Sequence, residues 1–135
     1  TKAEGWKDWT PIGNDSNKYT GTFDGQNHTI SGLYYDGSDQ YVGLFGHSSG
    51  TIKDVTVTDS YFSTTSSNDS IFVSGVCGLN YGTITNCTNE SEVNTTSENG
   101  SVYAGGVCGE NNGTITNSSN LSGYNFKIIG NALNN

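Results

Sequence analysis

The sequence predicts an all-β fold: a right-handed parallel β-helix (solenoid) of about four coils with an N-terminal aromatic cap. A repeated phrase, a strand-like alternation inside it and the absence of helix signals together predict this class. The phrase occurs as YVGLFGHSSGTIKDV from Tyr41, VSGVCGLNYGTITNC from Val73 and AGGVCGENNGTITNS from Ala104. Repeats of about 20 to 50 residues are typical of solenoids, propellers and arrays. Crossovers between parallel strands are overwhelmingly right-handed, which predicts the hand.

A propeller or sandwich is the alternative architecture for such repeats. Propeller blades of about 40 to 45 residues contain four antiparallel strands, whereas equivalent glycines of the three copies here are 32 and then 31 residues apart. One copy per blade would leave about three or four blades, and few hairpin turns are present to build them. The period therefore favours the β-helix, in which corresponding residues stack ~4.8 Å apart along the axis.

The N-terminal segment, residues 1–20, is the expected cap. Trp6, Trp9 and Pro11 lie in it, and an aromatic segment there would cover the open end of the core, since an uncapped sheet edge invites association. The β-helical repeats are expected over residues 21–127, beginning with a shorter copy, TFDGQNHTISGL from Thr22. Residues 128–135 begin like another copy, so we expect either a further repeat or a truncated end there.

Glycines bracket the segments HSS, LNY and ENN and predict a tight turn in every coil, where a Cβ would be sterically costly. The predicted turn glycines are Gly46, Gly50, Gly78, Gly82, Gly109 and Gly113. After each turn comes a strand-like alternation, with Thr83 outward, Ile84 inward and Thr85 outward.

A corner is predicted next, because a second inward residue follows each isoleucine after three positions and so breaks the alternation. The corner residue is Asp54, Asn86 or Asn117, with Gly32 in the first copy, and these residue types tolerate left-handed backbone angles. Variable polar excursions follow, DSYFSTTSSNDS after Thr58 and NESEVNTTSENGS after Thr88. The excursions account for a period longer than a minimal coil.

Charge and composition exclude several classes of partner. The 135 residues carry a formal net charge of −8, with five lysines and no arginine. Nucleic acid is therefore not expected, because phosphate backbones require a positive surface. Membrane insertion is not expected either, since no run of about 18 apolar residues is present. Hydrophobic residues make up only 31% of the chain, which suits a solenoid, where each coil needs few inward positions.

Three cysteines, Cys77, Cys87 and Cys108, fall at inward positions of the repeat. Free, buried thiols are one interpretation, and a Cys77–Cys108 bridge between neighbouring coils is the other. Stacked strands hold in-register Cβ atoms somewhat farther apart than the ~3.8 Å of a relaxed disulfide. Zinc would need a fourth ligand and a close-spaced pair, which His28 and His47 do not provide.

No enzymatic activity and no cofactor are predicted. Paired carboxylates for hydrolysis would have to lie on one face at a fixed separation, whereas Asp24 and Asp54 sit in or beside turns, where they cap the backbone. Calcium is the one cofactor candidate, at DGSDQ from Asp36. That segment lacks the closing Glu of a calcium loop, and a solvated polar loop is the alternative.

The phrases WTPIGN from Trp9, GTFDGQNHTISGL from Gly21, YVGLFG from Tyr41, and GVCGLNYGTITNC with GVCGENNGTITNS resemble the GLUG-motif repeats. Those repeats occur in large secreted or surface proteins of bacteria, including the N-terminal region of IgA-specific metallopeptidases. The resemblance covers roughly residues 9 to 118 and implies a right-handed β-helix-like domain, extracellular or wall-attached, without catalysis of its own. The metallopeptidase zinc motif HExxH is not present in this sequence, so proteolysis does not carry over.

Outward threonines form the most regular candidate ligand face. Thr29, Thr51, Thr83 and Thr114 are predicted to share one column, with Ser31, Lys53, Thr85 and Thr116 in the next outward column. Two rows of hydroxyls on a flat sheet would match an ordered lattice such as ice or a polysaccharide. The alternative is that threonine simply suits an exposed strand position.

The sequence thus predicts a non-enzymatic extracellular repeat module that serves as stalk or adhesive surface of a larger bacterial surface protein. Its expected partner is a surface ligand, either a glycan or a host protein. The alternatives are a filament subunit that stacks head-to-tail and a carbohydrate-binding or carbohydrate-active β-helix. Specificity is expected to lie in residues that differ between copies: the turns HSS, LNY and ENN, the threonines and the excursions.

Overall fold

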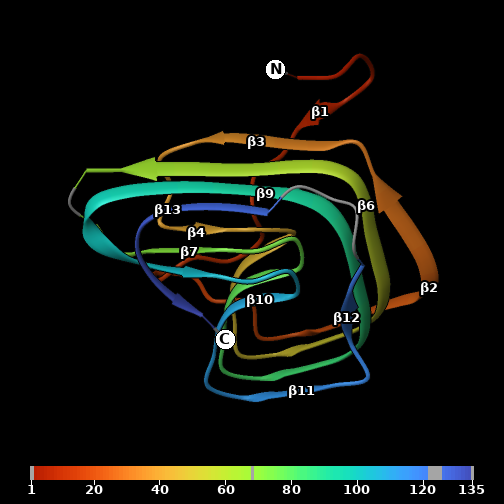
Figure 1. The fold of residues 1–135 in the computed structure, drawn as a ribbon. Helices are drawn as coiled ribbons and strands as arrows, with labels where there is room; N and C mark the ends of the chain where they lie inside the picture. The colour runs from red at the N-terminus through yellow and green to blue at the C-terminus, as the bar shows by residue number, and fades with distance from the viewer. Residues whose placement is uncertain (1, 68, 122–125, 135) are drawn as a thin grey trace.

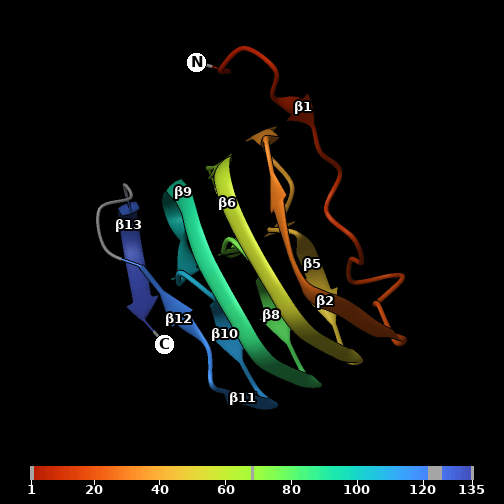
Figure 2. The same ribbon diagram turned by 90° about the vertical axis from the view of Figure 1, so that its right-hand side faces the viewer.

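A computed structural model describes residues 2–67, 69–121 and 126–134 of the chain, and in these residues every regular element is a β-strand. All of the strand pairs are parallel, and each strand lies beside its counterpart in the next turn (Figure 1). The predicted all-β parallel solenoid is therefore confirmed. Viewed from the side, the turns follow one another from the N-terminal to the C-terminal end of the stack (Figure 2).

The described strands make three full turns and most of a fourth. The first turn contains β2 (Thr22–Ser31), β3 (Leu33–Gly37), β4 (Tyr41–Val42) and β5 (Phe45–Ser48). The second contains β6 (Thr51–Ser66), β7 (Ile71–Val73) and β8 (Cys77–Asn80), and the third contains β9 (Thr83–Ala104) and β10 (Cys108–Asn111). The fourth begins with β11 (Thr114–Thr116), β12 (Ser119–Asn120) and β13 (Phe126–Asn134). Among the described residues, ten strands form one wrapped sheet, and β5, β8 and β10 form a second.

The N-terminal segment covers the first turn, as predicted. Its short strand β1 (Lys7–Asp8) pairs with β3, and isolated bridges join Ile12 to Phe45 and Tyr19 to Ser48. The indole Nε1 of Trp9 donates to the carbonyl oxygens of Gly43 and Leu44 at 3.1 and 3.2 Å. Trp9, Ile12 and Tyr19 pack against the hydrophobic core, which closes this end of the stack.

The core is a set of columns that run along the solenoid axis. Ile52 pairs in register with Ile84, and Ile84 with Ile115, as the alternation predicts. A second column consists of Phe45, Cys77 and Cys108. Asparagines also stack inside the turns: the Nδ2 of Asn80 donates to the Oδ1 of Asn111 at 2.8 Å, and Asn89 donates to Asn120 at the same distance. These amide ladders satisfy polar groups that would otherwise be buried without partners.

All three thiols are free and buried, so the alternative of a Cys77–Cys108 bridge is wrong. Each thiol donates instead to a backbone carbonyl: Cys77 to Leu79 at 3.3 Å, Cys87 to Thr85 at 3.4 Å and Cys108 to Glu110 at 3.1 Å. Burial raises the pKa of Cys77 and of Cys87, because the thiolate loses its hydration.

The glycines are required by close packing, but three of them do not lie in turns. Gly46, Gly78 and Gly109 lie inside the buried strands β5, β8 and β10, a correction to the turn prediction. A Cβ on Gly78 would come within 2.8 Å of the carbonyl oxygen of Gly46, the glycine below it. Gly50, Gly82 and Gly113 do lie in the bends before β6, β9 and β11, and a Cβ on Gly82 would collide with the backbone of Gly50. Stacked glycines thus let successive turns approach closely.

The predicted corners are left-handed. Asp54, Asn86 and Asn117 have φ angles of 57°, 53° and 49°. Their side chains also stack, since the Nδ2 of Asn86 donates to the Oδ1 of Asp54 at 2.8 Å.

The corner predicted for the first copy is wrong. Phe23, not Ile30, pairs with Ile52, and Thr22, not Thr29, pairs with Thr51. The first corner is formed by Gln26 and Asn27, with φ angles of 53° and 62°, rather than by Gly32. The extra residues in this corner shift the register between Asp24 and His28. An alignment that assumes the one-residue corner of the later copies therefore matches Ile30, instead of Phe23, with Ile52.

Residues 59–66 of the first polar excursion and the whole of the second lie in strands. They form the long second halves of β6 and β9, which pair in register from Tyr61–Glu92 to Ser66–Ser97. Small polar residues such as Thr64, Thr95 and Ser97 are buried there at inward positions. The C-terminal segment continues the fourth turn beside this strand, with Phe126 opposite Val93 and Asn134 opposite Ala104. Up to Asn134, this segment is therefore the second half of the fourth turn and not the start of a further repeat. Residue 135 lies outside the described residues.

Candidate ligand-binding groove

Three aromatic side chains stack along the outside of the solenoid, one from each full turn. Tyr41 of β4, Phe72 of β7 and Tyr103 of β9 are paired in register. The Tyr41 and Phe72 ring centroids are 5.1 Å apart with planes 11° apart, and the Phe72 and Tyr103 rings are 4.6 Å apart at 7°. Such a stack forms because the strand period places equivalent residues directly above one another on the same face.

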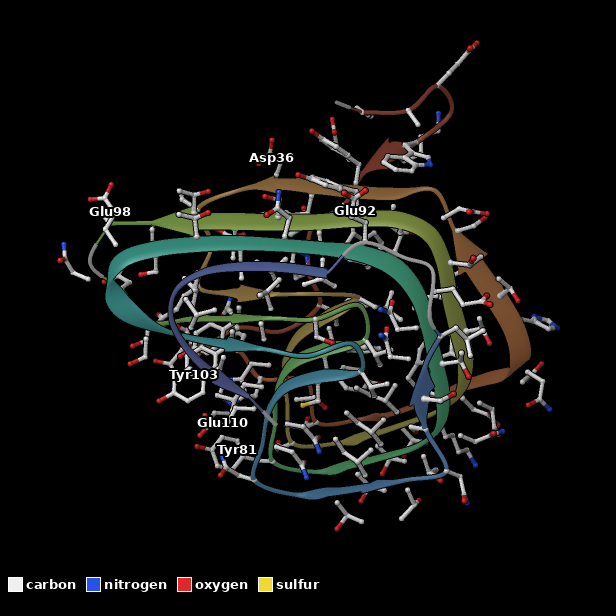
Figure 3. The ribbon with its side chains drawn as sticks, viewed as in Figure 1. Asp36, Tyr81, Glu92, Glu98, Tyr103 and Glu110 are labelled. Carbon is white, nitrogen blue, oxygen red and sulfur yellow. The ribbon has the colours of Figure 1, made fainter. Side chains whose placement is uncertain are left out.

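The neighbouring sheet extends this aromatic surface. His47 of β5 stacks on Tyr41 at 5.2 Å, and Tyr81, in the bend after β8, lies 5.6 Å from His47. Five rings therefore follow one another from Tyr103 to Tyr81. The Tyr81 side chain remains 53% exposed, so it is the ring most available to a ligand. Tyr81, Tyr103 and Glu110 all project from this side of the stack (Figure 3).

A groove of about 510 Å³ lies over four of these rings, those of Phe72, Tyr41, His47 and Tyr81, and we call it the aromatic groove. It is lined by Asp15, Lys18, Tyr41, His47, Ser49, Phe72, Leu79, Tyr81 and Glu110. A second hollow of about 270 Å³ continues it, because Asp15 and Tyr41 border both. The N-terminal segment supplies one wall, whereas the bends and strands of three successive turns supply the floor.

His47 is the most unusual polar group in the groove. Its side chain is only 2% exposed, and neither ring nitrogen has a hydrogen-bond partner among the described residues. Burial lowers the pKa of His47, Lys18 lowers it further and Asp15 opposes them, so the imidazole is held neutral. Burial, with the negative charges of Asp15 and Glu110, raises the pKa of Tyr41.

The sequence prediction that specificity lies in the turns HSS, LNY and ENN leads to part of this groove. His47, Leu79 and Glu110 are the first residues of those three segments and share one column. The aromatic stack was missed because Tyr41 was aligned with Val73. Val42, rather than Tyr41, pairs with Val73. The reason is that two residues separate Val42 from Phe45 in the first turn, whereas three residues separate Val73 from Cys77 in the second. The spacing of 31 residues from Tyr41 to Phe72 and again to Tyr103 is the signal that would have found it.

The threonine rows lie on other faces and are less regular than predicted. Thr51, Thr83 and Thr114 do stack in one column, but with Thr22 at its end, while Thr29 stacks on Thr56 beyond the corner. In the adjacent column the Oγ1 of Thr116 donates to Thr85 at 2.8 Å, and Lys53 lies 3.9 Å from Asp24. Hydroxyls that bond to one another and a charged pair interrupt the flat, repeating lattice that ice binding would need.

Within the described residues, no group of three or more His, Cys, Asp or Glu side chains is placed to hold a metal ion. In the predicted calcium segment, the backbone N–H of Asp39 donates to the phenol oxygen of Tyr35 at 2.8 Å, and the carbonyl of Asp39 accepts from Thr64 at 2.6 Å. Calcium binding there stays a prediction.

Comparison with known proteins finds two partial relatives. The chain is 32% identical over 85 residues to a "Putative Gly-rich membrane protein" of Evansella cellulosilytica, which covers 61% of this chain and 10% of that protein. It is 38% identical over 103 residues to the Halomucin of Haloquadratum walsbyi, which covers 69% of this chain and 1% of that protein. The chain thus corresponds to a small part of each relative. No family model matches the chain, and no solved structure does.

The described residues include no helix with the length and apolar character needed to cross a bilayer.

Proposed function

We propose that the chain is a non-enzymatic, extracellular β-solenoid module that serves as a binding surface of a larger bacterial surface protein. The aromatic groove is the observation that carries this proposal. It combines an exposed ring, Tyr81, with a few polar groups, His47, Lys18 and Glu110, which is the composition of ligand sites in general. His47 and Glu110 lie on β5 and β10, which pair with β8 from opposite sides, so strand pairing fixes the spacing of these two groups along the stack.

The relatives and the resemblance to GLUG-motif repeats support the location. One relative is named as a membrane protein, and both are much longer than this chain. GLUG-motif repeats, which the phrases from Trp9 to Ser118 resemble, are found in secreted and surface proteins. A repeat module inside a long surface protein is consistent with each of these features, and it places the groove where it meets external ligands.

Surface retention tests the proposal. The 135-residue chain, labelled with a fluorophore at its N-terminus, is incubated with bacterial cells, host epithelial cells and insoluble polysaccharides, and the bound fraction is measured after washing. Tyr81→Ala removes the exposed ring of the groove, while Leu121→Ala is the matched control, because Leu121 is the other exposed large hydrophobic side chain among the described residues and does not line the groove. We expect at least one surface to retain the wild-type chain and the control, and to lose most of the Tyr81→Ala variant. Equal retention of all three proteins, or none on any surface, would contradict a role for the groove. Circular dichroism confirms that the variants are folded.

A further inference from the structure

We infer that the aromatic groove binds an uncharged pyranose oligosaccharide; this inference rests on the proposed function and names the class of its ligand. Stacking is the first argument. Sugars in the pyranose form present an apolar face of C–H groups, and aromatic side chains offer a large apolar surface with little conformational freedom to lose. Tyr81 presents such a surface at one end of the arc of rings, and Tyr41 borders both the groove and the hollow beside it.

Hydrogen bonding is the second argument. Buried polar groups are almost always paired, yet both ring nitrogens of His47 lack a partner while the side chain lines the groove. A neutral imidazole has one N–H donor and one acceptor nitrogen. The two nitrogens point away from each other, so two separate hydroxyls of an oligosaccharide, each able to donate or accept, would pair one nitrogen each. A ligand that offers only carboxylate oxygens accepts but does not donate, and would leave the acceptor nitrogen unpaired.

Charge is the third argument. The groove contains two carboxylates, Asp15 and Glu110, and one ammonium group, Lys18, within a chain whose net charge is −8. An acidic sugar would meet net repulsion, whereas a neutral sugar finds carboxylate acceptors and an ammonium donor for its hydroxyls.

Size is the fourth argument. The aromatic groove, at about 510 Å³, is in the ordinary range of small-molecule sites. The hollow of about 270 Å³ continues it past Tyr41, toward Asp39 and Gln40. A chain of linked sugar rings fits this extended shape better than a single ring does.

Isothermal titration calorimetry with the 135-residue chain tests the inference. The probes are the neutral hexasaccharides cellohexaose, mannohexaose and laminarihexaose, with hexagalacturonate as the acidic comparison. We expect at least one neutral probe to bind, hexagalacturonate to bind at least about tenfold more weakly, and Tyr81→Ala to weaken binding at least about tenfold. His47→Phe keeps a ring between Tyr41 and Tyr81 but removes both nitrogens, so it should also weaken binding, whereas the control Leu121→Ala should not.

The outcomes separate this inference from the proposed function. Retention on a surface that depends on Tyr81, without binding of any neutral hexasaccharide, would overturn the sugar inference and leave the binding function standing. Hexagalacturonate binding as tightly as the neutral probes would overturn the charge argument and with it the class of ligand. Neutral sugar binding that survives both Tyr81→Ala and His47→Phe would place the site elsewhere and overturn the inference as well.

Discussion

Replacement of Gly82 by alanine should strongly destabilise the solenoid, because the added methyl group would collide with the backbone of the adjacent bend. The Cβ of an alanine at this position would lie 2.6 Å from both the carbonyl carbon and the carbonyl oxygen of Ser49, and closer still to the carbonyl oxygen of Gly50. Non-bonded atoms need about 3.5 Å, so the bends of two adjacent turns would have to separate by at least about 1 Å. Both obstructing residues contribute backbone atoms, which cannot rotate away as a side chain can.

The magnitude follows from the hydrogen bonds that join these bends. The Thr83 N–H donates to the Gly50 carbonyl at 2.9 Å, and the Tyr81 N–H donates to the Ser48 carbonyl at 2.7 Å. A separation of about 1 Å would take both beyond hydrogen-bond range. Two bonds at about 1 kcal/mol each, with about 1–3 kcal/mol for crowding, give a loss of about 3–5 kcal/mol in the free energy of unfolding. A protein of this size should then melt about 10–15 °C lower.

Urea unfolding and thermal melts followed by circular dichroism measure this effect. Asn112→Ala is the matched control, because Asn112 occupies the same place in the next bend as Tyr81 does in this one and its side chain is exposed. The control should change stability by less than about 0.5 kcal/mol. A Gly82→Ala variant as stable as the control would refute the view that stacked glycines set the spacing of the turns.

Two further predictions concern buried titratable groups. Because burial lowers the pKa of His47 below its ordinary value of about 6.5, the unfolded chain binds more protons than the folded chain as the pH falls below 6.5. The free energy of unfolding should therefore be highest above that pH and decline from pH 7.5 to 5.5. The decline should be smaller in the His47→Phe variant. Equal shifts of the urea midpoint in the two proteins over this pH range would contradict the prediction. Since all three thiols are buried and free, native protein at pH 8 should react slowly with Ellman's reagent, and the protein unfolded in guanidinium should release three equivalents. Rapid reaction of Cys77 in the native protein, located by mass spectrometry, would show that this part of the core is open.

The parts of the fold that repeat could be predicted from the sequence because they obey local rules. Alternation around Ile84 identifies a strand with one buried face, and an Asp or Asn three residues after a threonine, as at Asn86, marks a left-handed corner. These properties depend on one residue and its neighbours along the chain. The need for glycine at Gly82 was also predictable, although its cause, contact with Gly50 one turn away, is a tertiary feature.

Two errors share a cause in the first turn, where the number of residues between strands differs from later turns. The first corner, at Gln26 and Asn27, is longer than the later corners, so Thr29 pairs with Thr56 instead of Thr51. The connection after Val42 is one residue shorter than in later turns, so the pairing of Tyr41 with Phe72 is not evident from the aligned repeats. A shift of one residue moves a side chain to the opposite face of a strand, so small differences in corner length had large effects on the predicted surface. The excursions were not predicted to be strands, because their inward positions carry Thr and Ser, which are polar but small enough to pack.

By itself, the sequence determined that the chain stacks in parallel turns with an isoleucine column, a polar corner and a glycine in every bend, because each repeat carries the same local signals. Only the tertiary structure decided which surface residues meet. Asp15, His47 and Tyr81 lie far apart along the chain, and the aromatic groove that they line exists only because successive turns bring their side chains to one side of the solenoid. Contacts between turns depend on register, and register depends on how many residues each corner holds when the whole stack closes around its core.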